Sequence, residues 1–204
     1  MDKLKFSSLL CSQIFHDLAG SLSVIDNTLD LINPEESIAS NTEEFNFISK
    51  ASKQSVIQLK FLRLLFGRTT ENLIFDDVFE VSNRYLVLRD IELIWTKENL
   101  PVENDAIFIK LILSFFYGSK VILPFGGKIK VIYKNKNNFE IEFKGKKIID
   151  DEKILNLINA NSIYQIPDTK FTPFVFACLL SNELELRFKK SLQTNSVTYK
   201  ANKK

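Results

Sequence analysis

Along the first part of the chain, apolar residues recur with alternating spacings of four and three. The set between residues 4 and 32 is Cys11, Phe15, Leu18, Leu22, Ile25, Leu29 and Ile32. At about 100° per residue these positions fall on one narrow stripe of a helix, which is typical of a bundle or coiled-coil seam. Pro34 ends the helix, because proline disfavours helical backbone in the residue before it.

A second helix is predicted after the polar loop EESIASN. Thr42 with Glu43 and Glu44 is a typical N-terminal signal, and the helix runs through FNFISKASKQSVIQLKFLRLLF to Gly67. Two amphipathic helices in a hairpin cannot enclose a core by themselves. We therefore expect residues 1–70 to form a hairpin domain that pairs with a second copy, giving a homodimer built on a four-helix bundle.

Beyond the connector RTTENL, helical and strand patterns alternate. Gly126-Gly127 and the NKNN segment supply turns between strands. The sequence predicts an α+β fold for residues 71–204, a mostly antiparallel sandwich with helices on one face. The expected helices cover 76–86, 104–121, 152–159 and the run from Pro173 through FVFACLLS, and the expected strands are 91–96, 128–133, 139–143, 184–188 and 196–200.

Charge and cysteine content narrow the class of protein. The 27 basic and 25 acidic residues are interleaved and give a net charge of +2, so we expect no nucleic-acid partner. Cys11 and Cys178 form no CxxC pair, which suits a reducing compartment. No leader pattern is visible, and no apolar run approaches the roughly 20 residues that cross a bilayer. We expect a cytoplasmic protein without membrane association.

His16 is the single histidine of the sequence. On a helical wheel it lies about 140° from the centre of the apolar stripe, so it is expected to point outward. The residues that share its sector are small or polar, which leaves room for another protein to reach the ring. They are Ser12, Gln13, Gly20, Ser23 and Asn27.

Two interpretations of His16 stay open at this point. A lone histidine on a helix surface is commonly solvated and without a role. A neutral imidazole can instead attack phosphorus through a ring nitrogen. Asp17 would then orient the ring or balance its charge, although an ordinary surface carboxylate reads the same way.

The segment HDLAGSL at 16–22 resembles the phosphoacceptor motif of two-component histidine kinases, with Ser21 where those kinases usually carry proline. Three further blocks extend the likeness, and all of them together resemble the ChpT-type histidine phosphotransferases over nearly the whole chain. These blocks are LKFLRLLFG at 59–67, IKLILSFFY at 109–117 and LPFGG at 123–127, added to LCSQIFHDL at 10–18.

The resemblance implies a dimeric hairpin carrying the phosphorylated histidine, followed by a degenerate kinase-ATPase-like domain. His16 would accept phosphate from the receiver domain of a hybrid kinase and pass it to response-regulator receivers, with Asp17 supporting. Receivers would dock on the outward face of the first helix and near Gln54 and Gln58, and would bring the Mg²⁺ themselves. No cofactor of the protein's own is expected.

Missing motifs restrict the chemistry further. The spacing of the six glycines matches neither the glycine-rich loops of a kinase ATP site nor a P-loop. Ser114 and Phe115 stand where a kinase has its Asn-rich helix. With one histidine, no metal site or triad is expected. Asp76-Asp77 and Asp150-Asp151 are read as helix caps, and Trp95 as core. Two rival functions remain, a divergent ATP-dependent sensor kinase and a noncatalytic dimeric scaffold for receivers.

Overall fold

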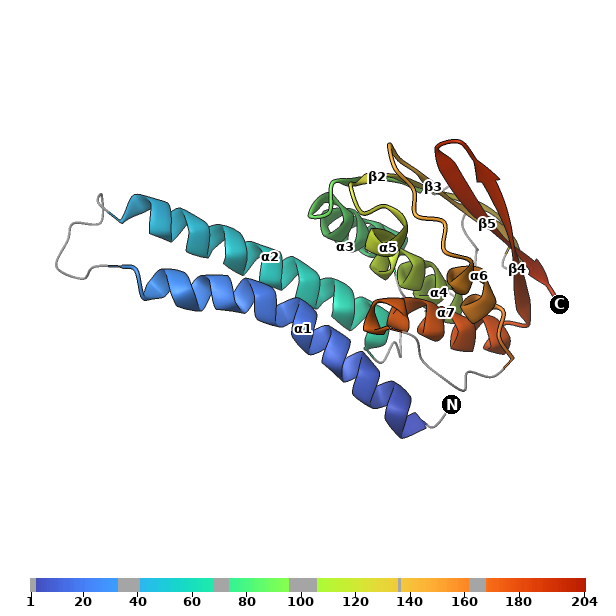
Figure 1. Ribbon diagram of the computed structural model, residues 1–204, viewed down its shortest axis with the longest axis horizontal. Helices are drawn as coiled ribbons and strands as arrows, with labels where there is room; N and C mark the ends of the chain where they lie inside the picture. Colours follow the sequence, from blue (N-terminus) through green and yellow to red (C-terminus); the bar gives the residue numbers. More distant parts are fainter. Residues whose placement is uncertain (1–2, 33–40, 68–73, 96–105, 136, 162–167) are drawn as a thin grey trace.

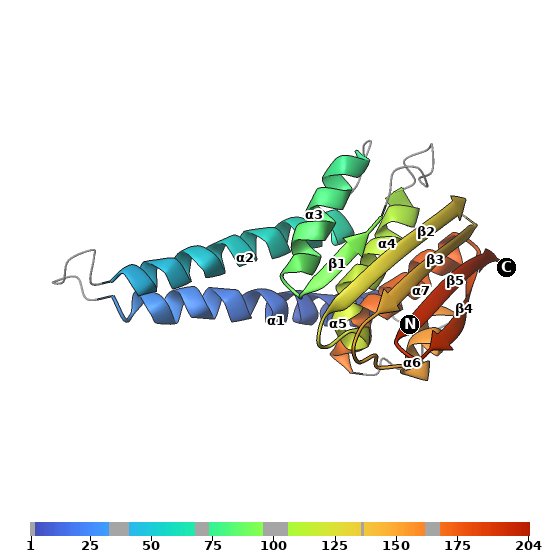
Figure 2. The ribbon, with the colours of Figure 1, turned by 90° about the horizontal axis from the view of Figure 1, so that it is seen from above.

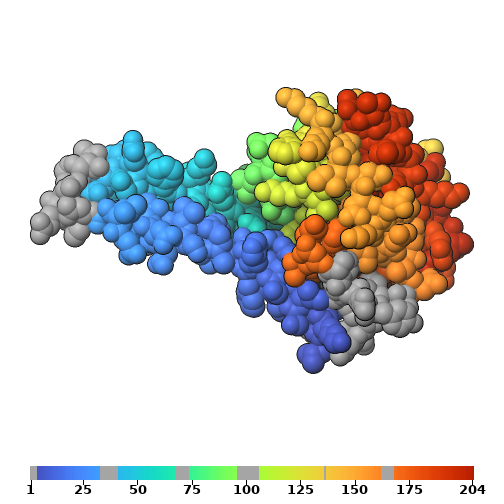
Figure 3. Space-filling model, in the orientation of Figure 1, coloured from blue at the N-terminus to red at the C-terminus, as the bar shows by residue number. Residues whose placement is uncertain are grey.

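The computed structural model describes residues 3–32, 41–67, 74–95, 106–135, 137–161 and 168–204. Helices α1 (Lys3–Leu29) and α2 (Thr42–Phe66) run antiparallel as a long hairpin. Much of the hairpin projects from a compact body formed by the rest of the chain (Figures 1 and 3). The second helix begins and ends where its sequence signals predicted, with Gly67 donating its N–H to the Arg63 carbonyl.

The hairpin buries only part of the predicted apolar stripe. Leu18 and Ile25 are half-buried beside α2, and Ser55 donates a hydrogen bond of 2.7 Å to the Ser21 hydroxyl across the two helices. One edge of the apolar stripe stays open. Its apolar side chains are Phe15, Leu22 and Leu29, which are 68%, 55% and 52% exposed.

The body contains one five-stranded mixed sheet with the strand order β1-β2-β3-β5-β4. β1 is parallel to β2, and every other neighbouring pair is antiparallel. The strands are β1 (Ile91–Ile94), β2 (Gly127–Asn135), β3 (Asn138–Lys144), β4 (Leu186–Gln193) and β5 (Ser196–Lys203). Strict alternation of buried and less buried residues along β3 shows that one face of the sheet meets the core.

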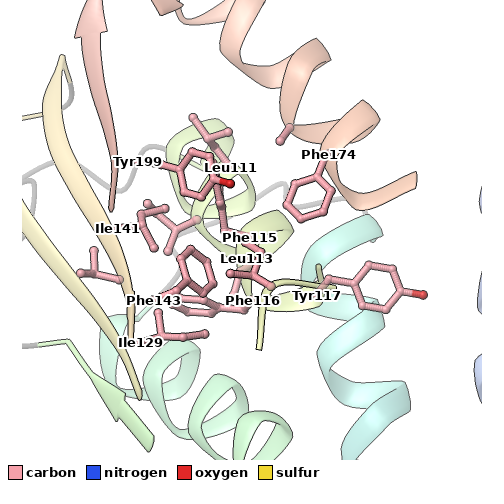
Figure 4. Packing of buried hydrophobic residues seen from close by; sticks show 14 of the residues in the cluster. Leu111, Leu113, Phe115, Phe116, Tyr117, Ile129, Ile141, Phe143, Phe174 and Tyr199 are labelled. Carbon is pink, nitrogen blue, oxygen red and sulfur yellow. The ribbon is translucent and has the colours of Figure 1, made fainter. Parts of the chain in front are cut away.

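Helices cover that inner face (Figure 2). They are α3 (Phe75–Val87), α4 (Ala106–Tyr117), α5 (Ser119–Ile122), α6 (Glu152–Ile158), the short 3₁₀ helix η2 (Thr169–Phe171) and α7 (Thr172–Glu183). Residues 111–117 of α4 are all buried, and Phe115 packs against aromatic rings of the sheet and of α7 (Figure 4). The predicted α+β class, with helices on one face, is confirmed.

One core joins the hairpin to the body. Phe61, Leu62 and Leu65 near the end of α2 belong to the same buried cluster as α4 and the sheet. Lys110 of α4 donates a 2.6 Å hydrogen bond to the Gly67 carbonyl. Near the N-terminus of α1, Phe6 stacks on Phe176 of α7, which gives the hairpin a second contact with the body. The end of α2 and the N-terminal half of α1 are therefore fixed to the body, while the predicted boundary between residues 70 and 71 lies outside the described residues.

Several element boundaries differ from the prediction by a few residues, and two of the differences have a clear physical cause. The helix expected over 104–121 is divided at Gly118 into α4 and α5, and residues 104 and 105 lie outside the described part of the chain. A Cβ on Gly118 would lie 2.6 Å from the Phe174 ring, so only glycine allows this close approach. The strand expected from Leu184 begins two residues later, because Glu185 turns the backbone with a φ of 54°.

Of the four carboxylates interpreted as helix caps, Asp151 occupies a cap position, whereas the cap position of α3 is Ile74 and Asp150 forms an ion pair with Lys190 at 2.6 Å. Asp151 caps α6 by accepting a hydrogen bond from the Lys153 N–H, and Asp76 and Asp77 lie in the first turn of α3. Such carboxylates offset the helix dipole. Trp95 is buried in the core, as expected.

By length and composition, residues 4–29 of α1 could cross a membrane, contrary to the expectation from the sequence. None of the apolar window is fully buried within the single chain. A helix of this kind near an N-terminus is weak evidence for a membrane span, because a helix that buries its apolar face against another chain passes the same test.

Candidate functional site

His16 lies in the middle of α1 with its ring in solvent. The side chain is 84% exposed, as its place on the helical wheel predicted. Its Nδ1 lies 3.5 Å from Oδ1 of Asp17, at the outer limit of a hydrogen bond. The other ring nitrogen is therefore free to meet a group brought by another molecule.

Asp17 has the opposite environment, because its side chain is only 18% exposed. Oδ2 accepts a 2.6 Å hydrogen bond from the Tyr117 hydroxyl of α4, and Oδ1 accepts one of 3.0 Å from Nε2 of Gln13, one helical turn earlier. The backbone carbonyl of Asp17 accepts a further bond of 3.1 Å from Nε2 of Gln58 on α2. Asp17 thus lies where α1, α2 and α4 meet.

The ring of Tyr117 is fixed by aromatic neighbours. It packs at centroid distances of 5.8 to 6.4 Å against Phe61 and Phe66 of α2 and Tyr85 of α3. Phe61 and Tyr85 stack at 3.7 Å, and the Arg89 guanidinium lies 3.6 Å above the Tyr85 ring. We call Phe61, Phe66, Tyr85 and Tyr117 the junction aromatics. In Figure 4, Tyr117 points away from Phe115 and Phe116, toward α2.

The electrostatics of the junction keep the Tyr117 hydroxyl protonated. Burial raises the pKa of Tyr117 far above its ordinary value, and the charge of Asp17 and the hydrogen bond to it raise it further. At every working pH the phenol is therefore a donor, and the Asp17 carboxylate oxygen is its acceptor.

The other residues predicted to face a partner lie in two kinds of environment. Ser12, Ser23 and Asn27 are exposed, and no atom approaches within 4 Å of a Cβ added to the exposed Gly20. Gln54 is half-buried. Gln13 and Gln58 each donate to Asp17, so these two residues shape the site from within the chain.

The roles of Tyr117 and Gln58 are not evident in the sequence. Tyr117 ends an apolar block and reads as core, and the pattern around Gln58 predicts only a contact with a partner. Nothing in the spacing shows that either side chain reaches Asp17, because the contacts join residues 100 and 41 positions apart.

The described residues include no group of three or more His, Cys, Asp or Glu side chains that could hold a metal ion. Helix α4 contains the residues that the sequence resemblance places where a kinase has its nucleotide site. Its single small polar side chain, Ser114, donates to the Lys110 carbonyl of the same helix. Phe115 and Phe116 beside it are fully buried.

No protein-family model matches the sequence. The protein phosphotransferase ChpT of Brucella abortus (strain 2308) is 21% identical over 207 aligned residues, 98% of this chain and 97% of that protein.

Solved structures extend the comparison. A bacterial phosphotransferase structure aligns with 99% of this chain and 98% of its own, with a TM-score of 0.79 and 23% identity. The histidine kinase AdeS of Acinetobacter baumannii covers 91% of this chain at a TM-score of 0.42 and 15% identity, too low to support an argument. In sequence and in fold, the chain therefore resembles the ChpT-type phosphotransferases along its whole length.

Proposed function

We propose that this protein is a histidine phosphotransferase of a two-component phosphorelay. His16 accepts a phosphoryl group from the receiver domain of a hybrid histidine kinase and passes it to the receivers of response regulators. The full-length likeness to a protein phosphotransferase supports the phosphotransfer role. The observation that carries the proposal is the one histidine of the chain, solvent-exposed in the middle of a long helix and followed by a carboxylate with three hydrogen-bond donors to its residue.

Phosphoryl transfer requires few covalent steps from the acceptor protein. Its rate depends mainly on positioning of the reacting groups and on neutralisation of the phosphoryl charge. A ring nitrogen of His16 attacks the phosphorus of the receiver's phosphoaspartate as the bond from phosphorus to the aspartyl oxygen breaks. The receiver's carboxylate leaves with the electron pair. The receiver supplies the Mg²⁺ that neutralises the phosphoryl oxygens.

Receivers dock on the outward face of α1. Ser12 and Gly20 lie one turn on either side of His16, and Ser23 and Asn27 continue the same exposed face, so a receiver can bring its phosphoaspartate to the ring. Contact continues to α2 near Gln54. One surface accepts donor and acceptor receivers alike, because the forward and reverse steps share one geometry.

The open apolar side of α1 pairs with a second copy. Phe15, Leu22 and Leu29 are spaced by seven residues, as in a coiled-coil seam, and each is more than half exposed in the single chain. Pairing of two hairpins into a four-helix bundle removes this surface from water. The dimer carries two His16 sites and resides in the cytoplasm.

The body takes part without nucleotide. The α4 residues that stand where an ATP-dependent kinase has its Asn-rich helix are Ser114, which donates to the Lys110 carbonyl of its own helix, and Phe115, which is buried in the core. A helix without asparagine or acidic side chains for Mg²⁺ and phosphate favours a phosphotransferase over an autophosphorylating sensor kinase. A nucleotide titration that detects tight ATP binding would contradict this part of the proposal.

The deciding experiment mixes the purified protein with labelled, phosphorylated receiver domains. We expect acid-labile label on the wild type and none on His16→Ala. Cys11→Ala, a change at another exposed position of the same helix, serves as the control and should label normally. Absence of label from a panel of receivers, with the dimer intact, would support a noncatalytic scaffold instead.

A further inference from the structure

The Asp17 carboxylate is the polar group of the site that reaches the body of the protein. Two of the donors on its residue come from the hairpin, Gln13 and Gln58, but the shortest bond comes from Tyr117 at the end of α4. A hydrogen bond to an ionised carboxylate is among the stronger kinds. The contact therefore links the residue next to the phosphoacceptor with a helix that packs against the sheet.

A carboxylate on a helix surface ordinarily rotates about its side-chain bonds and occupies several positions. Here Tyr117 holds Oδ2 while Gln13 holds Oδ1, which fixes the plane of the group. Oδ1 is then directed to Nδ1 of His16 at 3.5 Å. A negative oxygen on that side favours the imidazole form with its proton on Nδ1, and the lone pair then lies on Nε2.

We propose that Tyr117 is a positioning residue for His16: by holding the Asp17 carboxylate beside Nδ1, its hydroxyl keeps the lone pair of Nε2 turned outward for the incoming phosphoryl group. The inference deepens the proposed phosphotransfer function and rests on it. In the transfer, the Nε2 lone pair forms the bond to phosphorus, the receiver's aspartyl oxygen leaves with its electron pair, and the proton stays on Nδ1 facing Asp17.

In this assignment the body of the protein positions the site, although we propose that it binds no nucleotide. The junction aromatics set where the Tyr117 hydroxyl lies, and they bring together α2, α3 and α4. Because the ring is only 6% exposed, the hydroxyl cannot swing into water while the body is folded.

The test compares Tyr117→Phe with Tyr199→Phe. Both variants keep a buried ring in the core, but Tyr199 lies on β5, outside the junction aromatics, and its hydroxyl has no hydrogen-bond partner among the described residues. We expect Tyr117→Phe to slow transfer at saturating receiver by about tenfold, since small misplacement of a reacting group is costly. The half-saturating receiver concentration should not change, because Tyr117 is buried away from the docking face. Tyr199→Phe should transfer like the wild type.

A double-variant cycle separates positioning from loss of stability. In an Asp17→Asn background, Tyr117→Phe should cause no further loss of rate, because the hydroxyl acts through the Asp17 carboxylate. Equal loss in both backgrounds would overturn the proposal, as would a wild-type rate in Tyr117→Phe.

A second readout does not depend on phosphate. Since His16 is the single histidine, long-range ¹H–¹⁵N NMR reports its ring protonation without ambiguity. At mildly alkaline pH we expect the Nδ1–H form to predominate in the wild type, and to decline toward the free imidazole mixture in Tyr117→Phe but not in Tyr199→Phe. Unchanged His16 signals in Tyr117→Phe overturn the proposal. A shift of those signals in a protein that no receiver labels would uphold the positioning contact and overturn the proposed function instead.

Discussion

Tyr85, Tyr117 and Tyr199 bury their phenol groups in the body, and burial is the main cause that raises the pKa of each. Among the described residues, Tyr117 is the one of the three whose hydroxyl donates to a carboxylate, that of Asp17. The Tyr199 hydroxyl has no hydrogen-bond partner among the described residues, and at Tyr85 the nearby Arg89 side chain partly offsets the rise in pKa. Tyr117 therefore contributes to the site, whereas Tyr199 contributes packing.

These raised pKa values predict how stability depends on pH. In the folded chain the three phenols stay protonated beyond about pH 10, where a phenol of the unfolded chain ionises. The unfolded state then binds fewer protons than the folded state, so the stabilisation is complete below about pH 10 and is lost as pH rises above it. Each tyrosine should contribute a decline of about 1.4 kcal/mol per pH unit.

Urea unfolding at a series of alkaline pH values measures this decline. Tyr199→Phe should make the slope shallower, since it removes one of the three ionisations without touching the site. A free energy of unfolding that stays level from pH 9 to pH 11 would show that the phenols are accessible to hydroxide, contrary to the structure.

Among the helices, two glycines occupy opposite environments. Gly20 lies inside α1 with open space around it, whereas Gly118 separates α4 from α5 directly against the fully buried Phe174. Helix propensity and packing therefore make opposite predictions for the same substitution at the two positions.

Gly20→Ala should stabilise the protein by about 0.5 to 1 kcal/mol, because alanine loses less conformational entropy in a helix. Gly118→Ala should destabilise it by about 1 to 3 kcal/mol, because the new methyl group meets a ring that cannot move aside. Chemical denaturation of the two variants in parallel measures both effects. A destabilised Gly20→Ala would indicate that another chain already packs on that face of α1.

In the whole molecule, the hairpin projects from the body (Figure 3). The exposed apolar residues of its seam are Phe15, Leu22 and Leu29 of α1. If two hairpins pair there, one charge in the seam should prevent pairing, because a buried unpaired carboxylate costs several kcal/mol.

We expect Leu22→Glu to convert the dimer to a folded monomer. Sedimentation velocity measures the oligomeric state, and circular dichroism checks that the body stays folded. Leu192→Glu introduces the same charge at a similarly exposed leucine on β4 and should leave the dimer intact. A wild type that sediments as a monomer at micromolar concentration would contradict the four-helix bundle.

The sequence predicted the fold class and most elements because each carries its own local signal. Thr42 to Gly67 contains a helix start, an amphipathic run and a helix stop, and β3 contains a strict alternation. The outward direction of His16 follows from helical periodicity in the same way. Gly118 and Glu185 were missed as boundaries, because a close approach to Phe174 and a left-handed turn depend on packing.

The sequence by itself therefore determined the elements, the outward-facing His16 and the carboxylate that follows it. Only the tertiary structure decided that this carboxylate turns inward to Tyr117 and that Gln58 donates to the Asp17 carbonyl. The physical reason is range: helical and strand periodicities repeat within a few residues, whereas the donors to Asp17 from α2 and α4 meet it only after the hairpin has packed on the body.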